Sequence, residues 1–113
     1  MSDTHVPEIA ATDAARLAEA GEVLLLDVRE PHEWDAGHAA GAVHLPLGAL
    51  DLRVLPSGRP LVMVCRSGNR SGKATAALVA AGYDARNMVG GMQSWAASGL
   101  AVVRDDGGQG HVA

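Results

Sequence analysis

Short apolar runs alternate with helix-like segments along this chain, and that alternation restricts the fold more than any other feature. Two runs contain only apolar residues, 23–26 (VLLL) and 61–64 (LVMV). Continuous apolar runs of this length are typical of strands buried on both faces, as in a parallel sheet covered by helices. Residues 42–45 and 85–89 are weaker strand candidates. We therefore expect an α/β fold with a mainly parallel sheet.

Helical segments are predicted between these runs. They are rich in alanine or begin with proline or glycine, and they cover residues 13–20, 31–34, 71–81 and 92–97. Thr12 can cap the first helix, and Gly21 and Gly82 are typical of the positions after the first and third helices. Residues 1–104 are predicted to form one domain, followed by a flexible Gly-rich tail, 105–113.

The length and composition describe one small domain. The chain has 113 residues, of which 48% are hydrophobic and 19% are charged, which suits a single core and not a disordered chain. Its net charge of −4 and its 3% aromatic content argue against nucleic acid or an anionic membrane as a partner. Residues 1–9 lack the features of a secretory signal, and no apolar run could span a bilayer. We expect a cytoplasmic protein.

The chain has one cysteine, Cys65, so neither an internal disulfide nor a thiolate-rich zinc site can form. Cys65 ends the second apolar run and opens a loop, CRSGNRS, that reaches the predicted helix at Ser71. Ligands of open α/β sheets bind at the carboxyl ends of strands, where this loop would lie. Gly68 permits dihedrals that let backbone N–H groups turn inward, and the helix start adds positive potential. With Arg66 and Arg70 at the rim, this pattern indicates a nucleophilic thiolate in an anion-binding loop.

Other polar residues have competing interpretations. Asp27 and Arg29 follow the first apolar run and should reach the same sheet edge as Cys65. They could order the loop, but we favour an ion pair or a helix cap. His38 is predicted to be a hydrogen-bonded structural residue and not a general base. No metal site is expected, because the histidines show no ligand spacing; they are His5, His32, His38, His44 and His111.

Three segments of the chain resemble signatures of the rhodanese-type sulfurtransferases. The loop 65–71 is similar to the active-site loop of that family. Upstream, the residues between Asp27 and Pro46 resemble its first signature, with DVRE, EW, GH and GA in order. Downstream, Gly82-Tyr83, Gly90-Gly91 and Trp95 resemble its closing segment. The resemblance runs from about residue 6 to residue 100 and is specific because all three segments occur in the family's order.

The resemblance implies a single rhodanese-like domain with a five-stranded, mainly parallel sheet flanked by helices on both faces. It also implies that Cys65 takes a sulfane sulfur from a small anionic donor such as thiosulfate, carries it as a persulfide and passes it to cyanide or a thiol. No metal or organic cofactor is implied, and no protein partner is indicated. The residues implied to bind the donor or hold the persulfide are Arg66, Ser67, Gly68, Asn69, Arg70 and Ser71.

Two other functions remain open at this point. The first is a cysteine-dependent phosphatase or an arsenate-reductase relative, because such enzymes bind a tetrahedral oxyanion in a similar loop. Their loop is one residue longer than this one, in which four residues separate Cys65 from Arg70. The second is a binding module that has kept the fold and lost activity. The presence of Cys65 together with both arginines counts against this second alternative.

Overall fold

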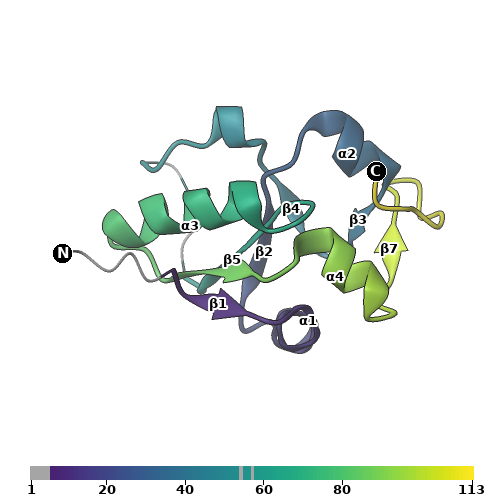
Figure 1. Ribbon diagram of the computed structural model, residues 1–113, viewed down its shortest axis with the longest axis horizontal. Coiled ribbons are helices and arrows are strands. Elements are labelled where there is room, and N and C mark those ends of the chain that lie inside the picture. Colours follow the sequence, from purple (N-terminus) through teal and green to yellow (C-terminus); the bar gives the residue numbers. More distant parts are fainter. Residues whose placement is uncertain (1–5, 54, 57) are drawn as a thin grey trace.

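Strands and helices alternate along the residues that the structure, a computed structural model, describes: 6–53, 55–56 and 58–113 (Figure 1). His5 and the other four residues before Val6 lie outside this part of the chain. In chain order, the elements are β1 (Glu8–Ile9), α1 (Ala11–Glu19), β2 (Leu24–Asp27), α2 (Pro31–Ala36), β3 (His38–Ala39), β4 (Val43–His44), the short 3₁₀ helix η1 (Leu47–Ala49), β5 (Leu61–Val64), α3 (Asn69–Ala80), β6 (Ala85–Met88), α4 (Gly91–Ala97) and β7 (Val102–Val103).

The main sheet has five parallel strands in the order β1-β6-β5-β2-β4. Of its central strands, β5 is the apolar run 61–64, and β2 combines three residues of the run 23–26 with Asp27. Every residue in both strands is buried. In the register between them, Asp27 lies opposite Val64, so both strands end at the same edge of the sheet. The expected α/β fold with a five-stranded parallel sheet is therefore confirmed.

Helices cover both faces of this sheet. In Figure 1, α3 lies over one face, and α1 and α4 lie over the other. Side chains alternate between the faces: Leu25 and Val62 pack in the core beside α1 and α4, whereas Leu26 and Met63 pack in the core beside α3. Burying each such side chain contributes about 1.5–3 kcal/mol, so a layer on both faces explains why the runs are continuously apolar. Cys65 belongs to the core beside α3.

Two helices begin at residues other than those predicted. α1 begins at Ala11 after Ala10, which makes no side-chain cap, so Thr12 lies inside the helix and its predicted role as the cap is wrong. α3 begins two residues earlier than predicted because Gly68, at φ +98°, takes the left-handed conformation that turns the chain directly into the helix. This early start puts Ser71 in the first turn of α3, beneath the loop.

The residues after Asp105 make defined contacts where we expected a flexible tail. The N–H groups of Gly110 and His111 donate to the carbonyls of Val102 and Ala36, at 2.8 and 3.0 Å. The Asp105 carboxylate accepts hydrogen bonds from side chains that lie 67 and 71 residues earlier in the chain. The prediction of flexibility came from local composition, which carries no information about partners so distant in sequence.

Candidate active site

Cys65 stands at the carboxyl end of β5, where the chain passes from the core to the surface. Its exposed fraction is 0%, whereas the next two residues, Arg66 and Ser67, are exposed. The loop then turns at Gly68 and enters α3 at Asn69. The sulfur therefore lies beneath its own loop, at the sheet edge where ligands of α/β folds bind.

Two groups of the loop and of α3 donate hydrogen bonds toward the sulfur. The N–H of Gly68 lies 3.0 Å from Cys65 Sγ, and the hydroxyl of Ser71 lies 3.2 Å from it. The Ser71 hydroxyl also lies 2.6 Å from Asn87 Oδ1. Because a hydroxyl has one hydrogen, Ser71 donates to one of these acceptors at a time. A charged thiolate is the stronger acceptor, so its formation draws that hydrogen toward the sulfur.

The surroundings of Cys65 lower the pKa of its thiol. Burial acts in the opposite direction and raises the pKa, because it disfavours the charged thiolate. The hydrogen bonds outweigh this effect: the Ser71 hydroxyl and the N–H groups of Ser71, Gly68 and Ser67 all stabilise the thiolate. The loop therefore favours the nucleophilic form of the cysteine.

The start of α4 holds the first part of the loop in place. The N–H of Met92 donates to the Cys65 carbonyl at 2.8 Å, and the N–H of Gln93 donates to the Arg66 carbonyl at 3.0 Å. Gly91 lies against the same two carbonyls at φ +55°, and a Cβ there would collide with both. A side chain at this position would push the loop away. In the sequence, this glycine was interpreted as a helix start and as part of the closing segment of the family resemblance, and not as a contact of the loop.

Asn87 on β6 links Gly68 in the middle of the loop to Ser71 at its end, and was not predicted as a site residue. Its side chain is buried, its Nδ2 donates to the Gly68 carbonyl at 3.0 Å, and its Oδ1 accepts from Ser71. The amide thus fixes both residues that donate to the Cys65 sulfur. A polar asparagine in the buried strand ARNM was the available signal, since buried amides are normally placed for their hydrogen bonds.

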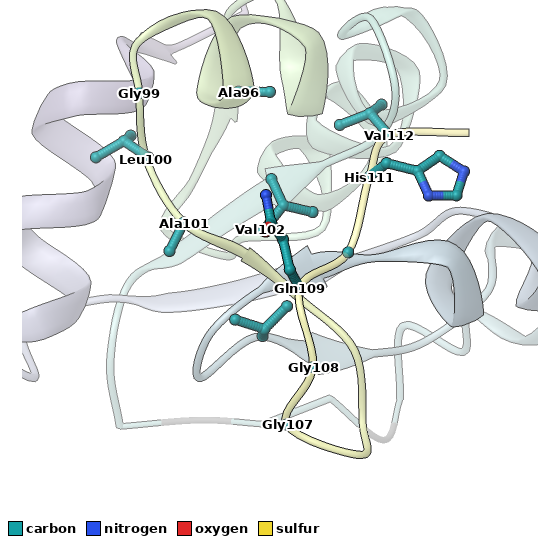
Figure 2. Close-up of a pocket in the computed structure, with 12 residues that line it drawn as sticks. Ala96, Gly99, Leu100, Ala101, Val102, Gly107, Gly108, Gln109, His111 and Val112 are labelled. Atoms are coloured by element: carbon teal, nitrogen blue, oxygen red, sulfur yellow. The ribbon is translucent and has the colours of Figure 1, made fainter.

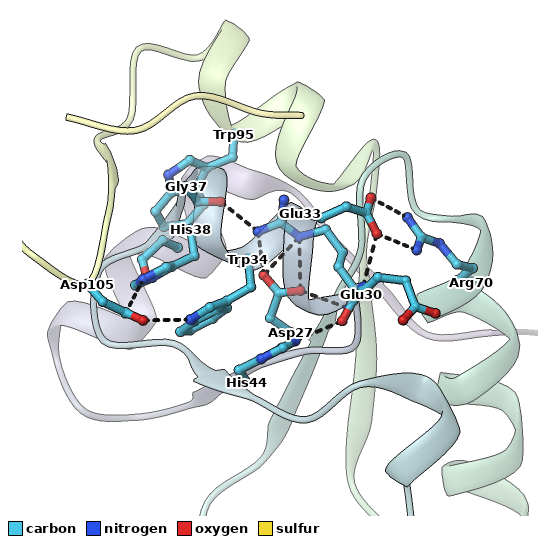
Figure 3. Close-up of polar contacts among 12 residues, drawn as sticks. Asp27, Glu30, Glu33, Trp34, Gly37, His38, His44, Arg70, Trp95 and Asp105 are labelled. Carbon is cyan, nitrogen blue, oxygen red and sulfur yellow. Dashed lines mark hydrogen bonds and ion pairs between the residues drawn. The ribbon is translucent and has the colours of Figure 1, made fainter. Parts of the chain in front are cut away.

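The two arginines of the loop have different surroundings. Arg66 is exposed, and its Nε donates to the Ala113 carbonyl at 2.9 Å. Arg70 is partly exposed and donates from both terminal nitrogens to the two carboxylate oxygens of Glu33, at 2.7 and 2.8 Å (Figure 3). The Arg70 hydrogen bonds lower the pKa of Glu33 to about 2, so this carboxylate is charged at neutral pH. In the sequence, Glu33 belongs to the EW signature but was not predicted as a site residue.

Asp27 and Arg29 form a buried ion pair next to α2 (Figure 3). The Asp27 carboxylate accepts from the backbone N–H and the side chain of Arg29, at 2.9–3.1 Å, and Arg29 also donates to the Gly37 carbonyl at 2.8 Å. Among the described residues, no hydrogen bond joins this pair to Cys65. The pair ties the end of β2 to the end of α2, which agrees with the structural role that we favoured.

His38 lies in a stack of aromatic rings, and among the described residues no hydrogen bond joins it to the sulfur. The Trp34 ring stacks on His38 at 3.6 Å and on His44 at 4.7 Å between ring centroids. His38 Nε2 and Trp34 Nε1 both contact the Asp105 carboxylate, at 2.8 and 3.2 Å (Figure 3). His38 is hydrogen-bonded within the fold, in the way expected of a structural histidine, while Trp95 packs in the core beside α1 and α4.

One hollow of the surface lies away from the cysteine loop, whereas another, of about 470 Å³, is lined by Gly68, Asn69 and Asn87. Figure 2 shows the first hollow, of about 670 Å³, between the end of α4, β7 and the tail, with Leu100, Val102 and His111 in its wall. Its lining residues all come from 96–112, so the cysteine loop takes no part in it. Within the described ranges, no three His, Cys, Asp or Glu side chains gather as a metal-binding cluster, and no helix has the length and apolarity needed to cross a membrane.

A family model for the rhodanese-like domain matches residues 10–98, which is most of the chain and includes the whole cysteine loop. The chain belongs to the rhodanese-like domain family. Residues 65–68 of its cysteine loop connect β5 to α3, and residues 69–71 form the first turn of α3.

Individual relatives agree with this membership. A sulfurtransferase of Allochromatium vinosum is 40% identical over 81% of this chain and 89% of its own length. The crystal structure of a rhodanese-related protein from Thermoplasma volcanium has a TM-score of 0.79 and 31% identity, over 86% of this chain and 97% of that one. A thiosulfate sulfurtransferase from Pseudomonas aeruginosa has the same TM-score at 25% identity, over 96% of this chain and 22% of that one.

The rhodanese-like domain is often part of a larger protein among these relatives. The chain spans between 45% and 55% of the length of several other curated relatives, among them a Synechocystis protein of which it covers 55%. The family and its sulfurtransferase relatives support sulfur transfer as the general class of reaction.

Proposed function

We propose that this rhodanese-like domain takes a sulfane sulfur from a donor such as thiosulfate onto Cys65 and passes it to a thiol or to cyanide. One observation carries the proposal: the Cys65 sulfur lies 3.0 Å from the Gly68 N–H and 3.2 Å from the Ser71 hydroxyl, on a loop that lowers the pKa of its thiol. A thiolate prepared in this way is the nucleophile that sulfur transfer requires.

In the first step, the Cys65 thiolate attacks the outer sulfur of thiosulfate. A bond forms between Cys65 Sγ and that sulfur while the S–S bond of thiosulfate breaks, and its electron pair leaves with sulfite. The cysteine is left as a persulfide anion. The donors that now face Sγ, from Gly68 and Ser71, would stabilise the negative charge on the new terminal sulfur, as an oxyanion hole does for oxygen.

In the second step, the acceptor thiol or cyanide attacks the terminal sulfur and the Cys65 thiolate is regenerated. Both steps exchange one sulfur between nucleophiles, so the chemistry needs no metal or organic cofactor. We assign Arg66 and Arg70 to orienting the anionic donor, and the backbone around Ser67 and Asn69 to the wall of the anion site. A cytoplasmic setting, where free thiols are abundant, is part of the proposal.

The comparisons support this function without fixing its donor. The Allochromatium vinosum relative is named a sulfurtransferase, and the Pseudomonas aeruginosa structure is of a thiosulfate sulfurtransferase. Loop length also favours sulfur transfer over phosphate chemistry, because a loop with four residues between Cys65 and Arg70 makes a tighter ring around the sulfur.

The test is the Cys65→Ser variant in a thiosulfate-to-cyanide assay. We expect turnover to disappear because the chain has no other thiol that could carry sulfur. Thermal unfolding provides the control, since serine fills nearly the same volume and the variant should stay folded. Undiminished turnover in a folded variant would rule out a Cys65 persulfide.

A further inference from the structure

Glu33 on α2 binds the Arg70 side chain from outside the loop. Its carboxylate accepts both terminal nitrogens of Arg70, at 2.7 and 2.8 Å, and only 6% of the residue is exposed. The carboxylate is itself fixed, because its Oε1 also accepts the N–H of Glu30 at 3.0 Å in a capping box at the start of α2. Arg70 is therefore held by a rigid partner and not by a mobile surface carboxylate.

The charges around Arg70 nearly cancel. Glu33 and Glu30 both act on its guanidinium, as does the Cys65 thiolate. The remaining loop cation, Arg66, is exposed and donates to the Ala113 carbonyl. Glu33 and Glu30 thus stand against the two cations of the loop, while Arg29, which also acts on Glu33, is itself paired with Asp27. The two acidic side chains therefore offset most of the attraction that Arg66 and Arg70 would exert on a doubly charged donor.

We propose that Glu33 is a positioning and specificity-determining residue: by neutralising Arg70, it makes the site favour sulfane-sulfur donors with one negative charge over donors with two. This inference rests on the proposed function. The approach of an anionic donor to a thiolate is repulsive, and the repulsion grows with the donor's charge. An Arg70 without a carboxylate partner would offset this repulsion, and most strongly for a donor with two negative charges. When Arg70 is bound to Glu33, it keeps its hydrogen-bonding geometry but offsets much less of the repulsion.

Two donors isolate the effect of charge. Thiosulfate carries two negative charges and methanethiosulfonate carries one, and both present a terminal sulfur bonded to an oxidised sulfur. With either donor, the Cys65 thiolate forms a bond to the terminal sulfur as the donor's S–S bond breaks. The electron pair leaves with sulfite in one case and with methanesulfinate in the other, and a persulfide anion remains. Atoms and charges balance in both reactions, and no oxidant or reductant is needed.

The experiment compares the donors in the parent chain, in Glu33→Gln and in Glu33→Asp. Glutamine removes the charge and keeps the size, whereas aspartate keeps the charge and shortens the side chain. We expect Glu33→Gln to raise the ratio of kcat/KM for thiosulfate to that for methanethiosulfonate by about fivefold, mainly through a lower KM for thiosulfate. Glu33→Asp should keep a ratio close to that of the parent, even if both donors react more slowly.

The outcomes separate this inference from the proposed function. If the parent uses both donors and Glu33→Gln slows both equally, with an unchanged ratio, Glu33 only supports the structure and the inference fails alone. If the parent transfers sulfur from neither donor, the proposed function fails and the inference with it.

A measurement on the parent decides the question if the Glu33→Gln variant does not fold. Salt screens charges, so it weakens repulsion and attraction alike. With Arg70 neutralised, added monovalent salt should leave the KM for thiosulfate unchanged or lower it. A rise of several-fold would reveal a net positive site and contradict the inference.

Discussion

At the scale of single residues, the reactivity of Cys65 depends on a few hydrogen-bond donors. Burial alone would raise the pKa of this thiol and make it an inert core residue. The Ser71 hydroxyl and the loop N–H groups reverse that effect and lower the pKa. A buried cysteine is therefore inert or nucleophilic according to the number of hydrogen bonds that the loop donates to its sulfur.

A titration of Cys65 tests this balance. The rate of alkylation against pH should show a midpoint below about 8.5, the pKa of a free thiol, because the loop stabilises the thiolate. Ser71→Ala removes the hydroxyl and should raise the midpoint, whereas Ser98→Ala, at an exposed position beyond α4, should leave it unchanged. A parent midpoint at or above the free-thiol value would contradict the proposed stabilisation of the thiolate.

At the scale of elements, the loop is defined by the helices on either side of it. α3 starts at Asn69 and brings Ser71 to the sulfur, while the start of α4 binds the Cys65 and Arg66 carbonyls. These contacts restrain the conformation of the loop, because one part of it is hydrogen-bonded to α4 and its end belongs to α3. We therefore expect the number of residues in the loop to limit the size of the anion that it can accept.

This constraint predicts which anion the site accepts. We expect measurable thiosulfate sulfurtransferase activity and negligible hydrolysis of aryl phosphates, because a tight ring of N–H groups suits one added sulfur better than a phosphoryl group with three equatorial oxygens. Both substrates are assayed on one preparation, and then on a variant with one glycine inserted after Gly68. Faster phosphate hydrolysis than sulfur transfer by the parent would mean that loop size does not select the substrate.

The sequence predicted the parts of this fold that depend on local signals. The apolar runs predicted β2 and β5, and the residues from Cys65 to Ser71 predicted the loop, because burial on both faces and turn geometry leave direct marks on neighbouring residues. The sequence marks Glu33 and Asn87 only weakly, as part of the EW signature and as a polar residue in a strand candidate. Their roles come from pairing with residues 37 and 16 positions away, which only the fold brings together.

Short or irregular elements were harder to predict for a related reason. β1 has two residues and owes its place to pairing with β6, and β3 and β7 are equally short and pair across the chain. A strand of two residues is too short to show the alternation of apolar and polar side chains by which strands are predicted from a sequence. The contacts of residues 105–113 were missed for the same reason, since Asp105 binds Trp34 and His38, which lie far away in the sequence.

At the scale of the whole molecule, the C-terminal residues join the aromatic stack of α2 and β3 to the cysteine loop. Asp105 contacts His38 and Trp34, and Arg66 of the loop donates to Ala113. The pKa of Asp105 is lowered, first by its hydrogen bond from His38 and then by that from Trp34. A lowered carboxyl pKa means that this contact stabilises the tail above the usual carboxyl value of 3.8 and is lost as the pH falls.

Asp105→Asn tests the anchoring of the tail. Removing the charge should speed hydrogen exchange at the Gly110 and His111 amides, which donate to Val102 and Ala36, because the segment opens more often. The amides of β5 serve as an internal control and should exchange as in the parent. Equal exchange at the two tail amides in the variant and the parent would show that Asp105 does not hold the segment.

The most direct test of sulfur transfer through Cys65 is the intact mass of the protein after incubation with thiosulfate. We expect one added sulfur atom in the parent, its loss on addition of cyanide, and no added sulfur in Cys65→Ser. An unchanged parent mass under conditions in which thiocyanate is produced, or added sulfur on the serine variant, would contradict transfer through a Cys65 persulfide.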